Sequence, residues 1–209
     1  MANDMLDITR KLDPRTPVYP GDVPFARIEM FSHARGDPYA VSVLLGSAHA
    51  GTHVDLPLHF FAGAPEPPLE WFIGPAEVIH VGDWELLSGR EWPSGVRPLF
   101  RCEGMGPPPT ALVARMVTAR VPLIGLDIMS VDDLEDGTYP NHRALLGAGI
   151  PILESLDLSD TPEGSYELIA LPLAIPGADA TWVRAVLLPA RPRSHGEQPE
   201  QVGQVALVF

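Results

Sequence analysis

The chain has 209 residues, 45% of them hydrophobic, so we expect one compact domain with a sizeable core, and composition excludes disorder for most of it. The formal charge of −13 argues against nucleic acid and anionic membranes as main partners. The single cysteine, Cys102, excludes an internal disulfide framework. No apolar run approaches the roughly 20 residues of a membrane span. We therefore expect a cytoplasmic protein without a signal peptide.

Proline and glycine number 24 and 19, a level that disfavours long helices and favours short strands joined by rigid turns. Runs rich in Val, Ile, Leu or aromatic residues predict strands over 6–11, 26–31, 40–45, 76–81, 98–101, 122–126, 167–172 and 184–188. Two helices are predicted over 110–119, with Thr110 as the candidate cap, and over 141–147. The pattern indicates a strand-rich α/β domain over 1–189, followed by a polar, proline-rich tail over 190–209.

One segment gathers metal-ligand and acid–base side chains at unusual density, and it reads His49-Ala50-Gly51-Thr52-His53-Val54-Asp55-Leu56-Pro57-Leu58-His59-Phe60. His49 and His53 have the spacing of one face of a helical turn, whereas His53 and Asp55 have that of one side of an extended segment. Gly51 permits a backbone turn that lets the two halves converge. Histidine and carboxylate are the ligands of zinc, manganese and iron hydrolases. The spacing favours a metal site, with a polar loop or structural cluster as the alternative.

Further ligands are expected from outside this segment. His142 lies near the start of the second predicted helix, and Glu154 directly follows the apolar run 149–153. Asp127 and His33 are further candidates, and each of these four residues, taken alone, is more often an ordinary surface group. Because metals bind neutral imidazole, we expect a histidine-rich site to release its metal below about pH 6.

The segment 49–60 matches HxGTHxDxPxHF, the signature of the cyclase-like metal-dependent hydrolases. The chain resembles this family from about residue 6 to residue 189, and its bacterial kynurenine formamidase (arylformamidase) branch most closely. The other stretches that carry the resemblance are 16–22 (TPVYPGD), 125–127 (GLD), 130–132 (SVD), His142 with Glu154 twelve residues later, 163–173 (EGSYELIALPL) and 184–187 (RAVL).

The resemblance implies two divalent metal ions per subunit, zinc or alternatively manganese. It assigns His49 and His53 to one ion, His142 to the other, Asp55 and Glu154 to both, His59 to acid–base catalysis, and Tyr19 to a position near the substrate ring. It also implies a mixed β-barrel-like core of the swivelling β/β/α type with a few short helices, and a homodimer. The chain departs from the family pattern at Tyr19, at Ile128-Met129 and at Arg143, where a tryptophan, Thr-Pro and a second histidine are common.

The implied reaction is hydrolysis of an N-formyl arylamine, above all N-formyl-L-kynurenine to L-kynurenine and formate in tryptophan degradation. Zinc lowers the pKa of bound water from about 15.7 to about 7, which supplies hydroxide near neutrality. A histidine such as His59 can take a proton and return it to the leaving amine. The alternatives are a cyclic-amide (isatin-type) hydrolase of the same superfamily and a non-catalytic metal-binding protein. A serine nucleophile is disfavoured because the chain has no Gly-x-Ser-x-Gly motif.

Overall fold

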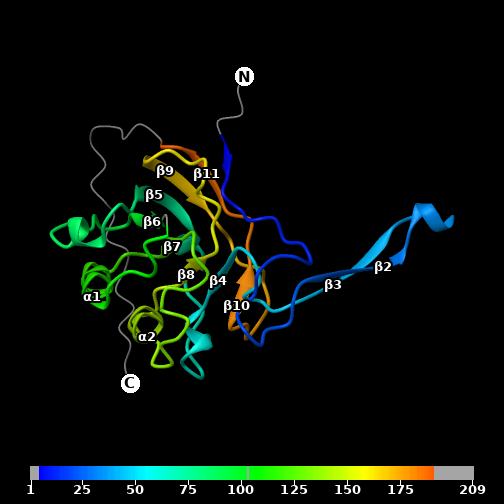
Figure 1. Ribbon diagram of the computed structural model, residues 1–209, viewed down its shortest axis with the longest axis horizontal. Helices are drawn as coiled ribbons and strands as arrows, with labels where there is room; N and C mark the ends of the chain where they lie inside the picture. Colours follow the sequence, from blue (N-terminus) through cyan, green and yellow to red (C-terminus); the bar gives the residue numbers. More distant parts are fainter. Residues whose placement is uncertain (1–4, 103, 191–209) are drawn as a thin grey trace.

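A curled nine-stranded sheet forms the body of the molecule, seen in a computed structural model that describes residues 5–102 and 104–190 (Figure 1). Its strands are β1 (Leu6–Asp7), β4 (His53–Asp55), β5 (Ile73–His80), β6 (Arg97–Arg101), β7 (Ile124–Leu126), β8 (Ile152–Glu154), β9 (Gly164–Ile169), β10 (Ala180–Trp182) and β11 (Val186–Pro189). They lie in the order β1-β11-β9-β5-β6-β7-β8-β4-β10. Strands β5 to β8 are parallel, and every other neighbouring pair is antiparallel.

Two helices, α1 (Thr110–Ala119) and α2 (Pro140–Gly147), cover one face of the parallel strands. Side chains alternate across a strand, so neighbours serve different cores. Val78 and Leu99 belong to the core that contains Val54 and Leu168, whereas Ile79 and Phe100 pack with the helices. Short 3-10 turns complete the described helical elements, at His33–Arg35, Pro57–His59, Leu69–Phe72 and Trp84–Leu87.

Glycine at position 125 of β7 lies close to the side chains of neighbouring residues. A Cβ atom there would lie 2.5 Å from Leu99 Cδ2 and 2.9 Å from Leu156 Cδ1, so any larger residue would require these buried leucines to shift. Strand β7 pairs with β8, the strand that ends on Glu154.

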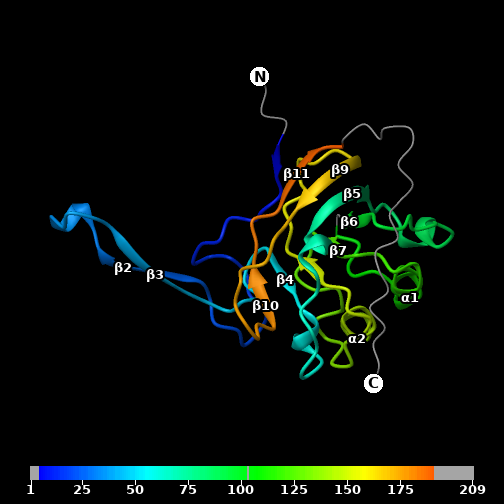
Figure 2. The same cartoon turned by 180° about the vertical axis from the view of Figure 1, so that it is seen from behind.

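A hairpin of β2 (Ala26–Phe31) and β3 (Val41–Leu45) projects from the body as a separate two-stranded sheet (Figures 1 and 2). Its strands pair antiparallel, with an irregularity between Glu29 and Phe31. All five residues of β3 are exposed, although four of them are Val or Leu. The sequence predicts these two strands but not their separation from the main sheet.

The predicted fold class is confirmed: a strand-rich domain with a curled mixed sheet and, in the described residues, two α-helices. Two strands of three residues each, β4 and β10, were not predicted as strands. Strand β8, also of three residues, overlaps the strand-like apolar run 149–153 and extends it to Glu154. The cap prediction for Thr110 is wrong, because Thr110 is the first helical residue and Pro109 precedes it without a side-chain cap. The tail predicted over 190–209 falls, from residue 191 on, outside the described residues, so it stays a prediction.

No helix among the described residues is both long enough and apolar enough to cross a membrane. The cytoplasmic location stays a prediction.

Candidate metal centre

Strand β4 lies within the predicted metal segment and is placed between β8 and the edge strand β10 of the sheet. The chain turns at Gly51, which has a positive φ of +66°, and then extends over His53–Asp55. The helical turn considered for His49 and His53 does not form. In the antiparallel pairing with β8, His53 lies opposite Glu154. Because directly opposed residues share a face of the sheet, and so do residues two apart on one strand, His53, Asp55 and Glu154 meet on one side.

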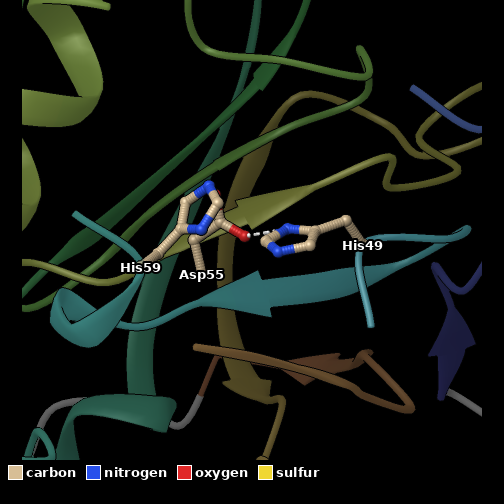
Figure 3. Close-up of side chains that lie close together, drawn as sticks. All are labelled: His49, Asp55 and His59. Carbon is tan, nitrogen blue, oxygen red and sulfur yellow. Dashed lines mark ion pairs between the residues drawn. The ribbon is translucent and has the colours of Figure 1, made fainter. Parts of the chain in front are cut away.

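The carboxylate of Asp55 is the centre of the site. Its Oδ1 lies 2.9 Å from His49 Nδ1 and 3.2 Å from His53 Nε2, and its Oδ2 lies 3.3 Å from His142 Nε2. Figure 3 shows the His49 ring facing this carboxylate. Glu154 closes the group, with Oε2 3.6 Å from His53 Nε2 and Oε1 3.5 Å from His142 Nε2. The structure thus brings together all five residues proposed as metal ligands from sequence.

Two of the histidines are oriented by acceptors on their outer nitrogens. The Nδ1–H of His53 donates to the Gly51 carbonyl at 2.8 Å. The Nδ1–H of His142 donates to Asp132 Oδ2 at 2.8 Å, and Asp132 also accepts from the backbone N–H groups of Asn141 and His142. Such bonds fix the tautomer, so that each Nε2 presents its lone pair to the centre. Sequence reasoning assigned no role to Asp132, which lies ten residues before His142 on a loop.

His59 and the unpredicted Asp179 lie at the exposed edge of the centre. The His59 and His49 ring centroids are 4.4 Å apart, and 29% of the His59 side chain is exposed against 1% for His53. Asp179 Oδ2 lies 3.1 Å from His49 Nε2 and 3.7 Å from His59 Nδ1. The side chains of His49 and His142 are 18% and 7% exposed, so His59 is the histidine of this cluster that a bound substrate can reach most easily.

The donor set fits a divalent cation. His53 Nε2 and both Asp55 oxygens are buried and have no hydrogen-bond partner, an arrangement that costs free energy unless a cation binds there. Ligand atoms of His53, Asp55 and Glu154 lie within 4.8 Å of one another, and so do those of His49, Asp55 and His59. The two groups share Asp55, which matches the bridging role proposed for it. The second group also means that distance alone does not separate His59 from the ligands.

The charges in the centre shift its pKa values strongly. Burial lowers the pKa of His49, but its contacts with Asp55 and Asp179 outweigh burial and raise that pKa to about 9. Burial also lowers the pKa of His142, but its contacts with Asp132 and Asp55 outweigh burial and raise that pKa to about 10. Burial and the Asp55 charge raise the pKa of Glu154 to about 7. The metal-free centre therefore holds protons that a cation must displace.

We predict that metal binding releases protons and weakens as the pH falls. Divalent cations bind neutral imidazole, and the pKa values of His49 and His142 are about 9 and about 10 in the metal-free chain. At pH 7.5 binding should release at least about two protons per chain, and affinity should fall steadily from pH 9 to pH 6. Protons thus compete with the metal for the histidine nitrogens well above the pH 6 expected from ordinary histidines. Titration calorimetry with zinc in buffers of different ionisation enthalpy measures the release. An affinity that stays constant over this range would contradict the prediction.

The other candidate residues lie apart from the centre or beside it. Tyr19 Oη lies 3.4 Å from Tyr139 Oη, and the Tyr139 ring packs against Phe60, with ring centroids 5.6 Å apart. Tyr19 thus lies on the α2 side of the site. Asp127 is not in the cluster, since it accepts a hydrogen bond from the Cys102 backbone N–H, and His33 lies in the 3-10 turn of the hairpin.

Comparison with known proteins decides the family. Residues 6–97 match the family model named Cyclase. The kynurenine formamidase of Salinibacter ruber is 38% identical, covering 88% of this chain and 96% of its own length. The kynurenine formamidase of Bacillus cereus is 35% identical, covering 90% and 99%. The chain belongs to the kynurenine formamidase family. The resemblance found in the sequence is thereby confirmed, and the chain is a hydrolase.

Solved structures agree with this family assignment at the level of the fold. Isatin hydrolase A from Labrenzia aggregata superposes with a TM-score of 0.74 at 25% identity, covering 90% of this chain and 94% of its own. A "predicted metal-dependent hydrolase" from Bacillus stearothermophilus superposes with a TM-score of 0.75 at 24% identity, covering 88% and 97%. This chain therefore shares its fold with isatin hydrolase A.

Proposed function

We propose that the chain hydrolyses an N-formyl arylamine, with N-formyl-L-kynurenine as the leading substrate, to the free amine and formate. The observation that carries the proposal is the buried Asp55 carboxylate, which faces three histidines with no hydrogen-bond partner of its own. It is supported by relatives named kynurenine formamidase that are 38% and 37% identical and match most of the chain.

The ligand roles follow from the contacts around Asp55. His49 and His53 would hold one divalent ion and His142 a second, and Asp55 and Glu154 would contact both. Zinc or manganese suits this donor set. Such ions supply hydroxide near neutral pH and stabilise the negative charge that forms on the substrate oxygen. The two carboxylates offset the cationic charge, which neutral histidines cannot do.

His59 would move the proton that the reaction needs. An aryl amide nitrogen leaves only when protonated, so a nearby group must take a proton from the attacking water and return it to that nitrogen. Burial lowers the pKa of His59, although the charges of Asp55 and Asp179 oppose the shift. A lowered pKa favours the neutral ring, which can accept the proton first. Its partial exposure lets a substrate reach it.

We propose that a cavity of about 280 Å³ receives the aryl part of the substrate. Its lining is apolar apart from one carboxylate, and consists of Leu56, Leu58, Gly63, Ala64, Pro65, Glu66, Gly177 and Ala178. Two of these residues are next in sequence to residues of the centre, since Leu58 precedes His59 and Ala178 precedes Asp179. An apolar cavity with a single polar group is the usual form of a small-molecule site.

An isatin-type cyclic amide is the second candidate, because isatin hydrolases share the fold. The test compares the zinc- and manganese-loaded chain on N-formyl-L-kynurenine and on isatin, following absorbance. The proposal expects the formamide to react with the larger kcat/KM. A larger kcat/KM for isatin would overturn the assignment of substrate while leaving the metal chemistry in place.

We also propose a homodimer, formed through the β2–β3 hairpin. Two-stranded sheets are at best marginally stable alone in water, yet this one exposes Ile28, Met30, Val43 and Leu44 by 45% or more. Exposed apolar surface of this kind marks a protein contact, and a second copy of the chain provides a matching apolar hairpin.

The hairpin proposal predicts that Val43→Glu converts a dimer into monomers. Val43 lies opposite Ile28 in the pairing, so the new charge enters the middle of one apolar face and must be desolvated in any contact made there. Light scattering after size-exclusion chromatography measures the mass. The matched control is Ser42→Glu, which places the same charge at the neighbouring position on the other face. A monomeric unsubstituted chain, or a Val43→Glu dimer, would refute the proposal.

A further inference from the structure

The backbone holds Asp179 firmly beside the metal centre. Strand β10 begins at the next residue, and Ala180 lies opposite Asp55 in its antiparallel pairing with β4. The Asp179 carbonyl accepts the backbone N–H of Leu56 at 2.9 Å. Asp179 is therefore fixed to the strand that carries His53 and Asp55, although it lies more than 120 residues further along the chain.

One oxygen of Asp179 faces two histidines of different function. Its Oδ2 is 3.1 Å from Nε2 of the proposed ligand His49 and 3.7 Å from Nδ1 of the proposed acid–base residue His59. His49 turns its other nitrogen, Nδ1, to Asp55 at 2.9 Å. The two imidazole rings lie 4.4 Å apart, tilted by 40°. A single carboxylate thus borders both the metal ligand set and the proton-transfer group.

We propose that Asp179 is a positioning residue shared by His49 and His59. By accepting the Nε2–H of His49, it leaves the Nδ1 lone pair directed at the metal position. Its Oδ2 lies 3.7 Å from Nδ1 of His59, beyond hydrogen-bond distance, so there the negative charge acts electrostatically: it favours the neutral tautomer with the hydrogen on Nδ1 and leaves Nε2 as the nitrogen that takes up the proton. The negative charge then stabilises the imidazolium that forms during turnover. This inference rests on the proposed function for the roles of His49 and His59.

Asp132 shows what a carboxylate with only one of these tasks looks like. It is 3% exposed, and its side-chain contacts are with His142 Nδ1 and with the backbone N–H groups of Asn141 and His142. It therefore orients a ligand and has no contact with His59. Comparing Asp179 with Asp132 separates an effect on the metal from an effect on the proton.

The first measurement is zinc affinity, by competition with a chromogenic chelator. Asp179→Ala should bind zinc about 10- to 100-fold more weakly, the usual cost of losing an outer partner of a ligand histidine. Asp179→Asn keeps an oxygen that accepts from His49 and should recover most of this affinity. Asp160→Ala, which removes an exposed charge elsewhere, should match the unsubstituted chain. Unchanged affinity in Asp179→Ala would overturn the role toward His49.

The second measurement is the tautomer of His59, read from long-range ¹H–¹⁵N spectra of the zinc-loaded chain. The neutral ring should carry its hydrogen on Nδ1 in the unsubstituted chain and in Asp132→Ala, and on Nε2 in Asp179→Ala. At saturating zinc, Asp179→Ala and Asp179→Asn should both lose kcat by about tenfold or more with little change in KM, because neither offers a negative charge. A His59 hydrogen on Nε2 in the unsubstituted chain would overturn the role toward His59.

These outcomes are independent of the substrate assignment. Zinc affinity and the His59 tautomer involve no substrate, so they test Asp179 in any case. A zinc-loaded chain that hydrolyses no N-formyl arylamine would contradict the proposed function alone, whereas normal turnover in Asp179→Ala at saturating zinc would contradict the shared role of Asp179 alone.

Discussion

His59→Ala is expected to retain its metal and to lose turnover by about 10²- to 10⁴-fold, the range that general acid–base catalysis supplies. The side chain lies at the edge of the cluster and is 29% exposed, whereas the side chains of His53 and Asp55 are each only 1% exposed. Removing an edge residue leaves the buried ligands in place, and it removes the group that protonates the leaving nitrogen. Metal analysis and kcat on N-formyl-L-kynurenine, measured on the same preparation, give the two numbers needed.

The control for this variant is His33→Ala, since His33 lies in the hairpin, away from the metal centre. It should keep both metal and turnover. The ligand atoms of His49, Asp55 and His59 are close enough to bind one ion, so the competing outcome is specific. If His59→Ala lost metal in proportion to activity, His59 would be a ligand and the proposed division of roles would fail.

Asp55→Asn is expected to remove both metal and activity. Asp55 is the one carboxylate in contact with His49, His53 and His142 together, and contacts with these histidines hold its pKa well below the ordinary value, although burial opposes the shift. The amide is nearly isosteric but uncharged, so it cannot offset two divalent cations. Zinc affinity should fall by well over about 100-fold, which exceeds the typical cost of losing only an outer partner.

Circular dichroism of Asp55→Asn should show an unchanged fold, since the substitution keeps the size of the side chain. The matched control is Asp157→Asn, an exposed aspartate outside the cluster, which should bind zinc normally. A folded Asp55→Asn chain that kept full zinc occupancy would show that the buried cluster is not the metal centre.

The sequence predicts the residues of the site better than the short strands that hold them. The spacing of His53 and Asp55 correctly indicates an extended segment, and the turn at Gly51 follows from its conformational freedom. However, β4, β8 and β10 have three residues each, too few to show any periodicity. Tertiary pairing, not local propensity, makes them strands.

Asp132 and Asp179 could not be identified as part of the site from residue type alone. Each is one of several aspartates on loops, and its partner histidine is 10 residues away for Asp132 and 130 residues away for Asp179. Only the pairing of β10 with β4 brings Asp179 to His49. For Asp132, the one available signal was its place in the stretch 130–132 that resembles the family.

The sequence likewise did not indicate that the β2–β3 hairpin projects from the main sheet. Runs 26–31 and 40–45 read as ordinary strands, because the hydrophobic content of a strand does not show which surface covers it. Only the folded chain shows that Val43 and Leu44 are exposed.

Chelation and reconstitution of the purified chain, followed by an N-formyl-L-kynurenine assay, test the central claim most directly. The account predicts zinc or manganese in the purified protein, loss of formamide hydrolysis on chelation, and recovery when the same metal is returned. Hydrolysis at an undiminished rate after complete removal of metal would contradict the metal centre around Asp55. A fully metal-loaded chain that left every N-formyl arylamine intact would contradict the proposed reaction.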